Sequence, residues 1–181
     1  TFNKGSLSTN TWTGAAADVA GLTITPPTND DGDFTLSVTA TATETANSET
    51  ATSGLETIAV TVAAVADAPT LTVNPDVSAN EDEDSGPLNI AAALVDGSET
   101  LSVVVSGLPT GATLSDSGSN SSTSASTDVS TWNLSSIKVR PAANSDVNFT
   151  LTTTATSTDT GSLTAATAEN TLVTVTAVAD A

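Results

Sequence analysis

The residues best suited to chemistry in this sequence are carboxylates, and they are gathered in a few short clusters. One cluster is Asn-Glu-Asp-Glu-Asp at 80–84, a second is Asp-Gly-Ser-Glu at 96–99, and a single Asp lies within Val-Ala-Asp-Ala-Pro at 65–69. Each lies next to a segment with the pattern of a β-strand. Because strand ends meet at the poles of a β-sandwich, we expect five side chains to converge there: Asp67, Glu81, Asp82, Asp96 and Glu99.

Converging carboxylates of this kind predict a divalent cation. Several carboxylates within a few ångströms of one another cannot all stay ionised unless a cation lies among them. The chain has no His and no Cys, and oxygen-only ligands favour Ca²⁺ over Zn²⁺. The alternative is that these are solvated acidic loops that keep the surface soluble. Composition alone does not separate the two, and the recurrence of the single Asp at Asp180 favours calcium.

The overall charge excludes several classes of partner. Three basic residues stand against 21 acidic ones, which gives a net charge of −18. Nucleic acid is therefore not an expected partner, because phosphate contacts need Lys and Arg. No run of about 18 apolar residues is present, so we expect no membrane insertion. The sequence also shows no catalytic Ser-His-Asp set, since it has no His, and we expect it not to be an enzyme.

The elements that must position the carboxylates are strands, and they occur twice. Phe34 to Thr43 reads FTLSVTATAT and Phe149 to Thr156 reads FTLTTTAT, so that the second copy follows the first by 115 residues. Solenoid units repeat at roughly 20–50 residues, so a period this long is that of a whole domain. We therefore expect a tandem array of domains.

Period-two alternation predicts the fold class. Apolar and hydroxyl residues alternate over 34–42, 57–63, 101–105 and 173–177, which is the pattern of strands with one buried face. Turn signals such as Leu-Pro-Thr-Gly at 108–111 separate these runs. We predict an all-β protein made of tandem immunoglobulin-like β-sandwiches. Buried positions in the second copy include Phe149, Leu151, Val173 and Val175.

The repeat also predicts the domain boundaries. Residues 68–181 form a complete repeat, whereas residues 1–67 match only the C-terminal half of one. The first sandwich is therefore incomplete at its N-terminus. The sequence has no visible signal peptide and begins with Thr, so we expect a piece of a longer chain. Either upstream sequence or another chain supplies the missing strands.

Three further features have a structural and a functional interpretation. Residues 29–33 (Asn-Asp-Asp-Gly-Asp) begin like an EF-hand loop but lack its final Glu, so a polar turn before a strand is favoured. Trp12 and Trp132 occupy matching places, and a core role is favoured over a sugar-stacking platform. Residues 116–130 are rich in Ser and Thr, and we expect a long exposed loop.

An ordered set of motifs resembles a known family. The segments Val-Ala-Asp-Ala-Pro-Thr-Leu at 65–71, Glu-Asp at 81–82, Asp-Gly-Ser-Glu-Thr-Leu at 96–101 and Gly-Leu-Pro-Thr-Gly-Ala-Thr-Leu at 107–114 are similar to the extender repeats of giant bacterial RTX-type adhesins. The resemblance implies a secreted array of immunoglobulin- or cadherin-like domains that binds Ca²⁺ near domain junctions. It implies as ligands the same residues: Asp67, Glu81, Asp82, Asp96 and Glu99.

These observations predict a non-enzymatic structural segment of a large bacterial adhesin or surface fibre. We expect an extracellular location on the bacterial surface and a role as a calcium-stiffened extender rod in cell adhesion or biofilm. The expected partners are neighbouring repeats of the same chain, and copies of the chain itself where it assembles into a fibre. The alternative is a ligand-binding module of the same architecture, which contacts a glycan or a partner protein through loops such as 116–130.

Overall fold

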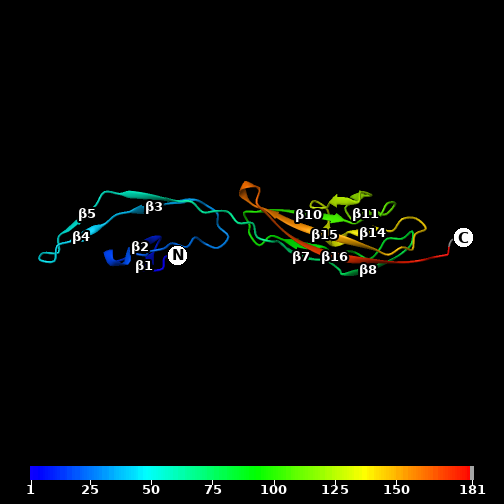
Figure 1. The fold of residues 1–181 in the computed structure, drawn as a ribbon, viewed down its shortest axis with the longest axis horizontal. Coiled ribbons are helices and arrows are strands. Elements are labelled where there is room, and N and C mark those ends of the chain that lie inside the picture. The colour runs from blue at the N-terminus through cyan, green and yellow to red at the C-terminus, as the bar shows by residue number, and fades with distance from the viewer. Residues whose placement is uncertain (180–181) are drawn as a thin grey trace. The chain divides into compact units, whose positions relative to one another are not determined.

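The chain forms an almost entirely β structure, which confirms the predicted all-β class. The computed structural model describes residues 1–179. The chain divides into two compact units, a first that comprises Thr1–Ala64 and a second that begins at Val65 (Figure 1). Asp180, the sequence counterpart of Asp67, lies outside the described residues. No helix within residues 1–179 is long and apolar enough to cross a lipid bilayer.

The first unit consists of hairpins. Its strands pair antiparallel as β1 with β2, β3 with β6 and β4 with β5, and one 3₁₀ turn (η1) follows β2. Their bounds are β1 (Ser6–Ser8), β2 (Thr11–Thr13), η1 (Ala16–Asp18), β3 (Phe34–Val38), β4 (Thr41–Thr43), β5 (Thr50–Thr52) and β6 (Glu56–Val60). Phe2 and Ile24 form an isolated antiparallel bridge outside these strands.

The second unit contains three sheets within residues 65–179. A five-stranded sheet has the order β13-β10-β15-β16-β8, a three-stranded sheet has the order β12-β11-β14, and β7 pairs with β9. All pairs are antiparallel except β16 with β8. The bounds are β7 (Thr70–Thr72), β8 (Asp76–Asn80), β9 (Ala91–Ala93), β10 (Thr100–Ser106), β11 (Thr113–Ser115), β12 (Ser121–Ser122), β13 (Ser126–Asp128), η2 (Leu134–Ser136), β14 (Lys138–Arg140), β15 (Phe149–Thr158), η3 (Thr160–Ser162) and β16 (Thr164–Thr176).

The core of the second unit lies between these sheets, in a sandwich-like arrangement. The five-stranded sheet contributes alternate residues such as Val103, Leu151 and Val173, and the facing strands contribute Leu114 and Val139, all at most 1% exposed. The small and branched residues at every second position are buried together because successive side chains of a strand point to opposite faces. Of the four positions predicted to be buried, Leu151, Val173 and Val175 are buried, and Phe149 is partly buried against the core.

The expected loop over residues 116–130 is only partly a loop. It contains the short strands β12 and β13, and β13 forms the edge of the five-stranded sheet against β10. Its Ser and Thr residues show no apolar alternation, so its composition predicted a loop. In the structure, part of its backbone pairs with neighbouring strands instead.

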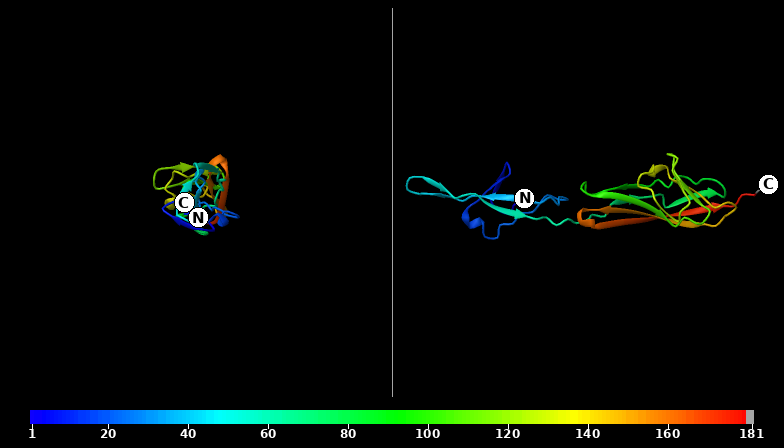
Figure 2. Two further views of the ribbon diagram at one scale, coloured as in Figure 1. Left: turned by 90° about the vertical axis from the view of Figure 1, so that its left-hand side faces the viewer. Right: turned by 90° about the horizontal axis from the view of Figure 1, so that it is seen from above.

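The long hairpin of β15 and β16 defines two ends of the second unit (Figures 1 and 2). At the entry end, the turn of this hairpin lies with the incoming segment, whose Pro69 carbonyl accepts a hydrogen bond from the Thr167 hydroxyl at 2.6 Å. At the exit end, β8 and β16 finish side by side, because Asn80 pairs with Thr176. The chain leaves the unit there.

Candidate functional site

Asp67 is held by its backbone at the entry end. Its amide donates a hydrogen bond to Oε1 of Glu99 at 2.7 Å, and its carbonyl accepts one from the Ser157 hydroxyl at 2.5 Å. Glu99 immediately precedes β10, and Ser157 lies next to the end of β15. The residue that precedes β10 and a residue of β15 thus both bind the segment by which the chain enters the unit.

Glu99 carries a buried carboxylate oxygen at this end that makes no hydrogen bond to the described residues. Its side chain is 5% exposed, and its Oε2 atom is buried with no hydrogen-bond partner among the described residues. A buried carboxylate oxygen without a partner is destabilising, because the water that it loses is not replaced. Glu99 therefore has an oxygen available for a cation.

Asp96 and Asp159 bring two more buried carboxylates to the entry end. Asp96 is 6% exposed, and its Oδ1 accepts the Ser98 amide at 2.9 Å, which closes the turn before β10. Asp159 is 7% exposed and follows β15. The β10–β15 ladder ends at the pair of Thr100 and Thr158, so Glu99 and Asp159 are the next residues along these two strands.

Asp159 is not among the site residues predicted from the sequence, although a signal for it exists. Its carboxylate Oδ1 accepts the Thr160 amide at 2.6 Å and the Thr160 hydroxyl at 2.9 Å. The repeat offset of 115 residues places Glu44 at the corresponding position of the first unit. There the Glu44 amide bonds the Glu49 carbonyl, as the Asp159 amide bonds the Leu163 carbonyl. An acid thus recurs at the same hairpin turn.

Glu81 and Asp82 lie at the exit end instead. The Glu81 amide donates to the Thr176 carbonyl at 3.0 Å, and Glu81 Oε1 accepts the Val178 amide at 2.5 Å. Asp82 has a positive φ of 66°, and its Oδ1 accepts the Asn144 amide at 3.3 Å. The five predicted carboxylates are therefore divided within the unit, three at the entry end and two at the exit end. The cause is the path of β7 and β8, which carry the chain from one end to the other before residue 81.

Across residues 1–179, no three acidic side chains are gathered in the arrangement of a metal site. Ca²⁺ commonly takes six to eight oxygen ligands, which include backbone carbonyls and water as well as carboxylates. The entry end offers the unpartnered Oε2 of Glu99 together with the carboxylates of Asp96 and Asp159. The chemistry of these donors fits a hard cation, although they are not drawn together around one point.

The acidic segment at 29–33 has a local structural use. Asp30 Oδ1 accepts the Gly32 amide at 3.0 Å, which forms a turn, and Asp33 Oδ1 accepts the Val62 amide at 2.9 Å. The second unit has the same contact, from the Val175 amide to Asn148 Oδ1 at 2.8 Å. Asp33 thus ties the start of β3 to the residues that follow β6. The segment itself is a polar turn before a strand, which is the favoured interpretation of its sequence.

Asp116 organises the Ser-rich region after β11 through the hydrogen bonds of its carboxylate. Its carboxylate accepts four hydrogen bonds, from the amides of Gly118, Asn120 and Asn133 and from the Asn120 side chain. These bonds, the one from the Asn120 side chain above all, lower the pKa of Asp116 to about 2. Hydrogen bonds to the ionised form have this effect because protonation would break them.

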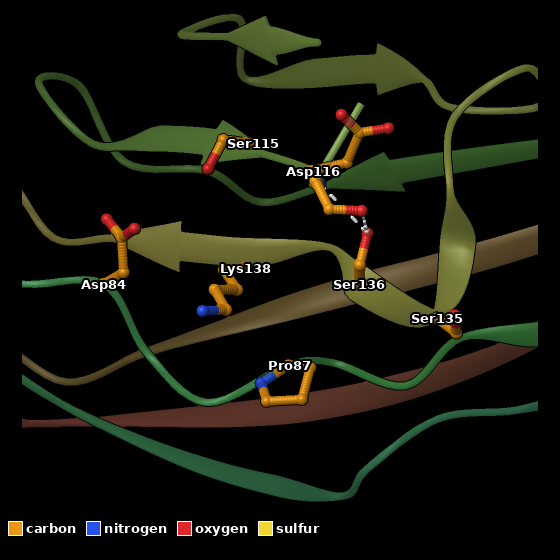
Figure 3. A pocket seen from close by; sticks show the side chains of 8 residues that line it. Asp84, Pro87, Ser115, Asp116, Ser135, Ser136 and Lys138 are labelled. Atoms are coloured by element: carbon orange, nitrogen blue, oxygen red, sulfur yellow. Dashed lines mark hydrogen bonds between the residues drawn. The ribbon is translucent and has the colours of Figure 1, made fainter. Parts of the chain in front are cut away.

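A shallow depression lies beside Asp116. It has a volume of about 430 Å³ and a lining made mainly of hydroxyl and charged side chains (Figure 3). Its residues are Asp84, Pro87, Ser115, Asp116, Ser117, Ser135, Ser136 and Lys138. The hydroxyls of Ser117 and Ser136 bond each other at 2.9 Å across it.

The two Trp residues are both partly buried. Trp132 packs against the core of the second unit. The Trp12 ring covers Gly5 and Gly14, where an added Cβ would lie within 2.4 Å of ring atoms, and its centroid is 6.0 Å from that of Phe2. Packing of this kind agrees with a structural role for both rings.

No protein-family model and no curated protein matches this chain.

Proposed function

We propose that this chain is a segment of a tandem-repeat rod from a large secreted bacterial adhesin or surface fibre, similar to an RTX-type extender. Each repeat is an immunoglobulin-like sandwich that supplies length and stiffness and performs no chemical reaction. In this proposal the chain lies outside the cell and its partners are its neighbouring repeats. The observation that supports the proposal best is that carboxylates hold the chain at both ends of the second unit.

The two backbone amides that these carboxylates bind occupy nearby positions in the repeated linker sequence. Glu99 binds the amide of Asp67 where the chain enters, and Glu81 binds the amide of Val178 where it leaves. Val178 is the sequence counterpart of Val65, because both begin the string Val-Ala-Asp-Ala. In an array of complete repeats, the Val amide of each linker would be bound by the repeat before it and the Asp amide by the repeat after it. One Ala separates these positions, so little free rotation would remain.

Calcium is the second part of the proposal. The entry end would hold the ion through Asp96, Glu99 and Asp159, with Asp67 next to them, and Glu81 and Asp82 are the acids that the exit end contributes. The ion would neutralise buried carboxylates in a chain whose net charge is −18. The support is the buried, unpartnered Oε2 of Glu99. Sites in extracellular modules commonly have dissociation constants on the order of 10⁻⁴–10⁻³ M.

The test of this proposal is a calcium titration followed by calorimetry and by NMR of the full chain. We expect the Asp67 and Ser98 amides to shift with calcium, and Glu99→Gln to abolish the response. Glu169→Gln is the matched control, because Glu169 is an exposed acid on β16. A response that survives Glu99→Gln, or no response at millimolar calcium, would exclude calcium at this end. The proposal of a rod would then be supported by the hydrogen bond between Asp67 and Glu99 without calcium.

A second candidate function follows from the depression beside Asp116. Its serine hydroxyls and Lys138 could bind a polar ligand such as a glycan, which would make the repeat a ligand-binding module of a surface protein. Saturation-transfer NMR against a panel of bacterial and host glycans tests this alternative. Loss of a specific signal in Lys138→Ala would support it, and the absence of any signal would leave the structural role.

A further inference from the structure

Two of the three basic residues of this acidic chain, Lys138 and Arg140, lie on the same face of β14. Val139 between them is fully buried, so both cations are on the solvent side of the strand. The segment Ser-Ile-Lys-Val-Arg-Pro at 136–141 corresponds to Gly-Leu-Thr-Ile-Thr-Pro at 21–26, which has Thr at both positions. The cations are thus specific to the second unit, and a role shared by all repeats does not explain them.

The acidic groups around Lys138 already have partners. Arg140 Nε donates to Asp84 Oδ1 at 2.8 Å, so these two charges neutralise each other. Each carboxylate oxygen of Asp116 accepts two hydrogen bonds, and the carboxylate points away from Lys138 (Figure 3). The Lys138 ammonium, in contrast, makes no hydrogen bond or ion pair within residues 1–179. It lines the depression beside Asp116 as a charge without a partner.

A second donor lies next to this ammonium. Ser115 is directly opposite Lys138 in the β11–β14 ladder. The side chains of such a pair lie on the same face of the sheet, with Cβ atoms about 4.5–5.5 Å apart. The Ser115 hydroxyl also has no hydrogen-bond partner among the described residues. An ammonium and a hydroxyl side by side are suited to bind the two oxygens of one carboxylate.

Other hydroxyls of the depression offer acceptors. Ser135 donates to Asn133 Oδ1 at 3.1 Å, and Ser117 donates to Ser136 Oγ at 2.9 Å. A hydroxyl oxygen can accept two hydrogen bonds. Within the described residues, the Ser135 oxygen accepts none, and the Ser117 oxygen accepts one, from the Asn133 side chain. These two oxygens can therefore accept hydrogen bonds from the hydroxyls of a ligand.

We propose that the depression beside Asp116 binds a sugar that carries a carboxylate, which is a uronic acid unit of an acidic polysaccharide. Its carboxylate accepts from Lys138 and Ser115, and its ring hydroxyls donate to Ser117 and Ser135. A neutral sugar would leave the Lys138 ammonium unpaired, and an acidic peptide would bring no ring hydroxyls to the two acceptors. This inference rests on the second candidate function above and names the class of its ligand.

The test is an NMR titration of the full chain with tetragalacturonate and with its methyl ester, after chelation of divalent cations. The ester has the same rings and hydroxyls but no charge, and chelation prevents calcium from bridging two acidic molecules. We expect the Ser115 and Lys138 amides to shift with the acid in a saturable way. The ester should bind at least about 10-fold more weakly, because it lacks the charge-assisted hydrogen bond.

Three variants locate the effect. Lys138→Thr introduces the residue found at the corresponding position of the first unit, and it should weaken binding of the acid by about 10-fold. Lys138→Arg keeps the charge and should retain most of the binding. Lys4→Thr is the matched control, because it removes the same charge from the first unit and should leave the affinity unchanged. The dispersion of the amide spectrum shows that each variant is folded.

The possible failures are distinguishable. Equal binding of acid and ester would overturn the assignment of an acidic sugar, while the second candidate function would stand with a neutral glycan. No response to either probe would overturn both and leave the structural role. An equal loss in Lys4→Thr and Lys138→Thr would show that net charge alone governs binding, and it would overturn the site at Lys138.

Discussion

The amide of Asp67 donates a hydrogen bond to the buried carboxylate of Glu99, which lies 32 residues further along the chain. This contact joins the incoming segment of the second unit to the first residue before β10. The second oxygen of Glu99 has no partner among the described residues, so only one of the two carboxylate oxygens accepts a hydrogen bond. That oxygen is the reason to expect calcium dependence.

We predict that calcium stabilises the second unit through Glu99. An ion that binds only the folded state at about 100 times its dissociation constant adds about 2.7 kcal/mol to the free energy of unfolding. Glu99→Gln should remove this increment, because the amide lacks the charge that attracts the ion. Thermal unfolding with calcium and with chelator measures the increment, and an increment that persists in Glu99→Gln would contradict the prediction.

The exit end offers a separate prediction. Glu81→Gln should speed hydrogen exchange at the Val178 amide, because the charged acceptor of that amide becomes neutral. Exchange at the Val173 amide, inside the β15–β16 pair, should not change. If both amides respond equally, the substitution has loosened the whole unit and Glu81 is not a local clamp.

A substitution at Leu151 tests the packing of the core. Leu151 is fully buried, so Leu151→Ala should lower the free energy of unfolding by about 2–5 kcal/mol through lost burial and a residual cavity. Leu163→Ala is the control, because Leu163 is 46% exposed and its truncation should cost less than about 0.5 kcal/mol. Urea denaturation measures both variants, and equal losses would contradict the observed core.

The repeated hydrogen bond at Asp33 and Asn148 predicts which substitutions are tolerated. Asn148→Asp should keep the bond to the Val175 amide, because the first unit makes the same bond with an Asp. Asn148→Leu should cost about 1–3 kcal/mol, because it leaves a buried amide without an acceptor. The outcome that opposes this account is equal stability of the two variants in urea.

Asp116 gives the second unit a predicted pH dependence. Its pKa falls from 3.8 to about 2 on folding, chiefly because the Asn120 side chain and the Asn133 amide bond the ionised form. A depressed pKa stabilises the folded state above pH 3.8, and this contribution is lost as the pH falls toward 2. Hydrogen exchange at the Asn133 amide should therefore accelerate over that range. In Asp116→Asn the step should disappear, whereas Asp146→Asn, at an exposed position, should retain it.

Much of the fold could be predicted from local alternation. The strands around Leu36, Val103, Leu151 and Val173 were predicted because a period of two directly reports a half-buried strand. The short strands β12 and β13 were missed, because their Ser and Thr residues carry no apolar period. Phe149 is only partly buried because it lies at the first position of β15.

The candidate site was less predictable than the fold. Acid clusters can be found in a sequence, but whether two of them share an end depends on how many strands separate them. Glu81 follows β8 and Asp96 precedes β10, which places them at opposite ends of the second unit. Asp159 could have been found, since Glu44 recurs at its offset, but a single acid in a Thr-rich turn has no distinctive local pattern.

Small-angle X-ray scattering from four tandem copies of residues 65–181, with calcium and after chelation, tests the calcium-stiffened rod itself. We predict a stiff particle in calcium and a shorter maximum dimension after chelation. In Glu99→Gln the dimension should be short in both conditions, and in Glu169→Gln it should follow the unsubstituted protein. A maximum dimension that neither chelation nor Glu99→Gln changes would contradict the claim that these carboxylates stiffen the chain.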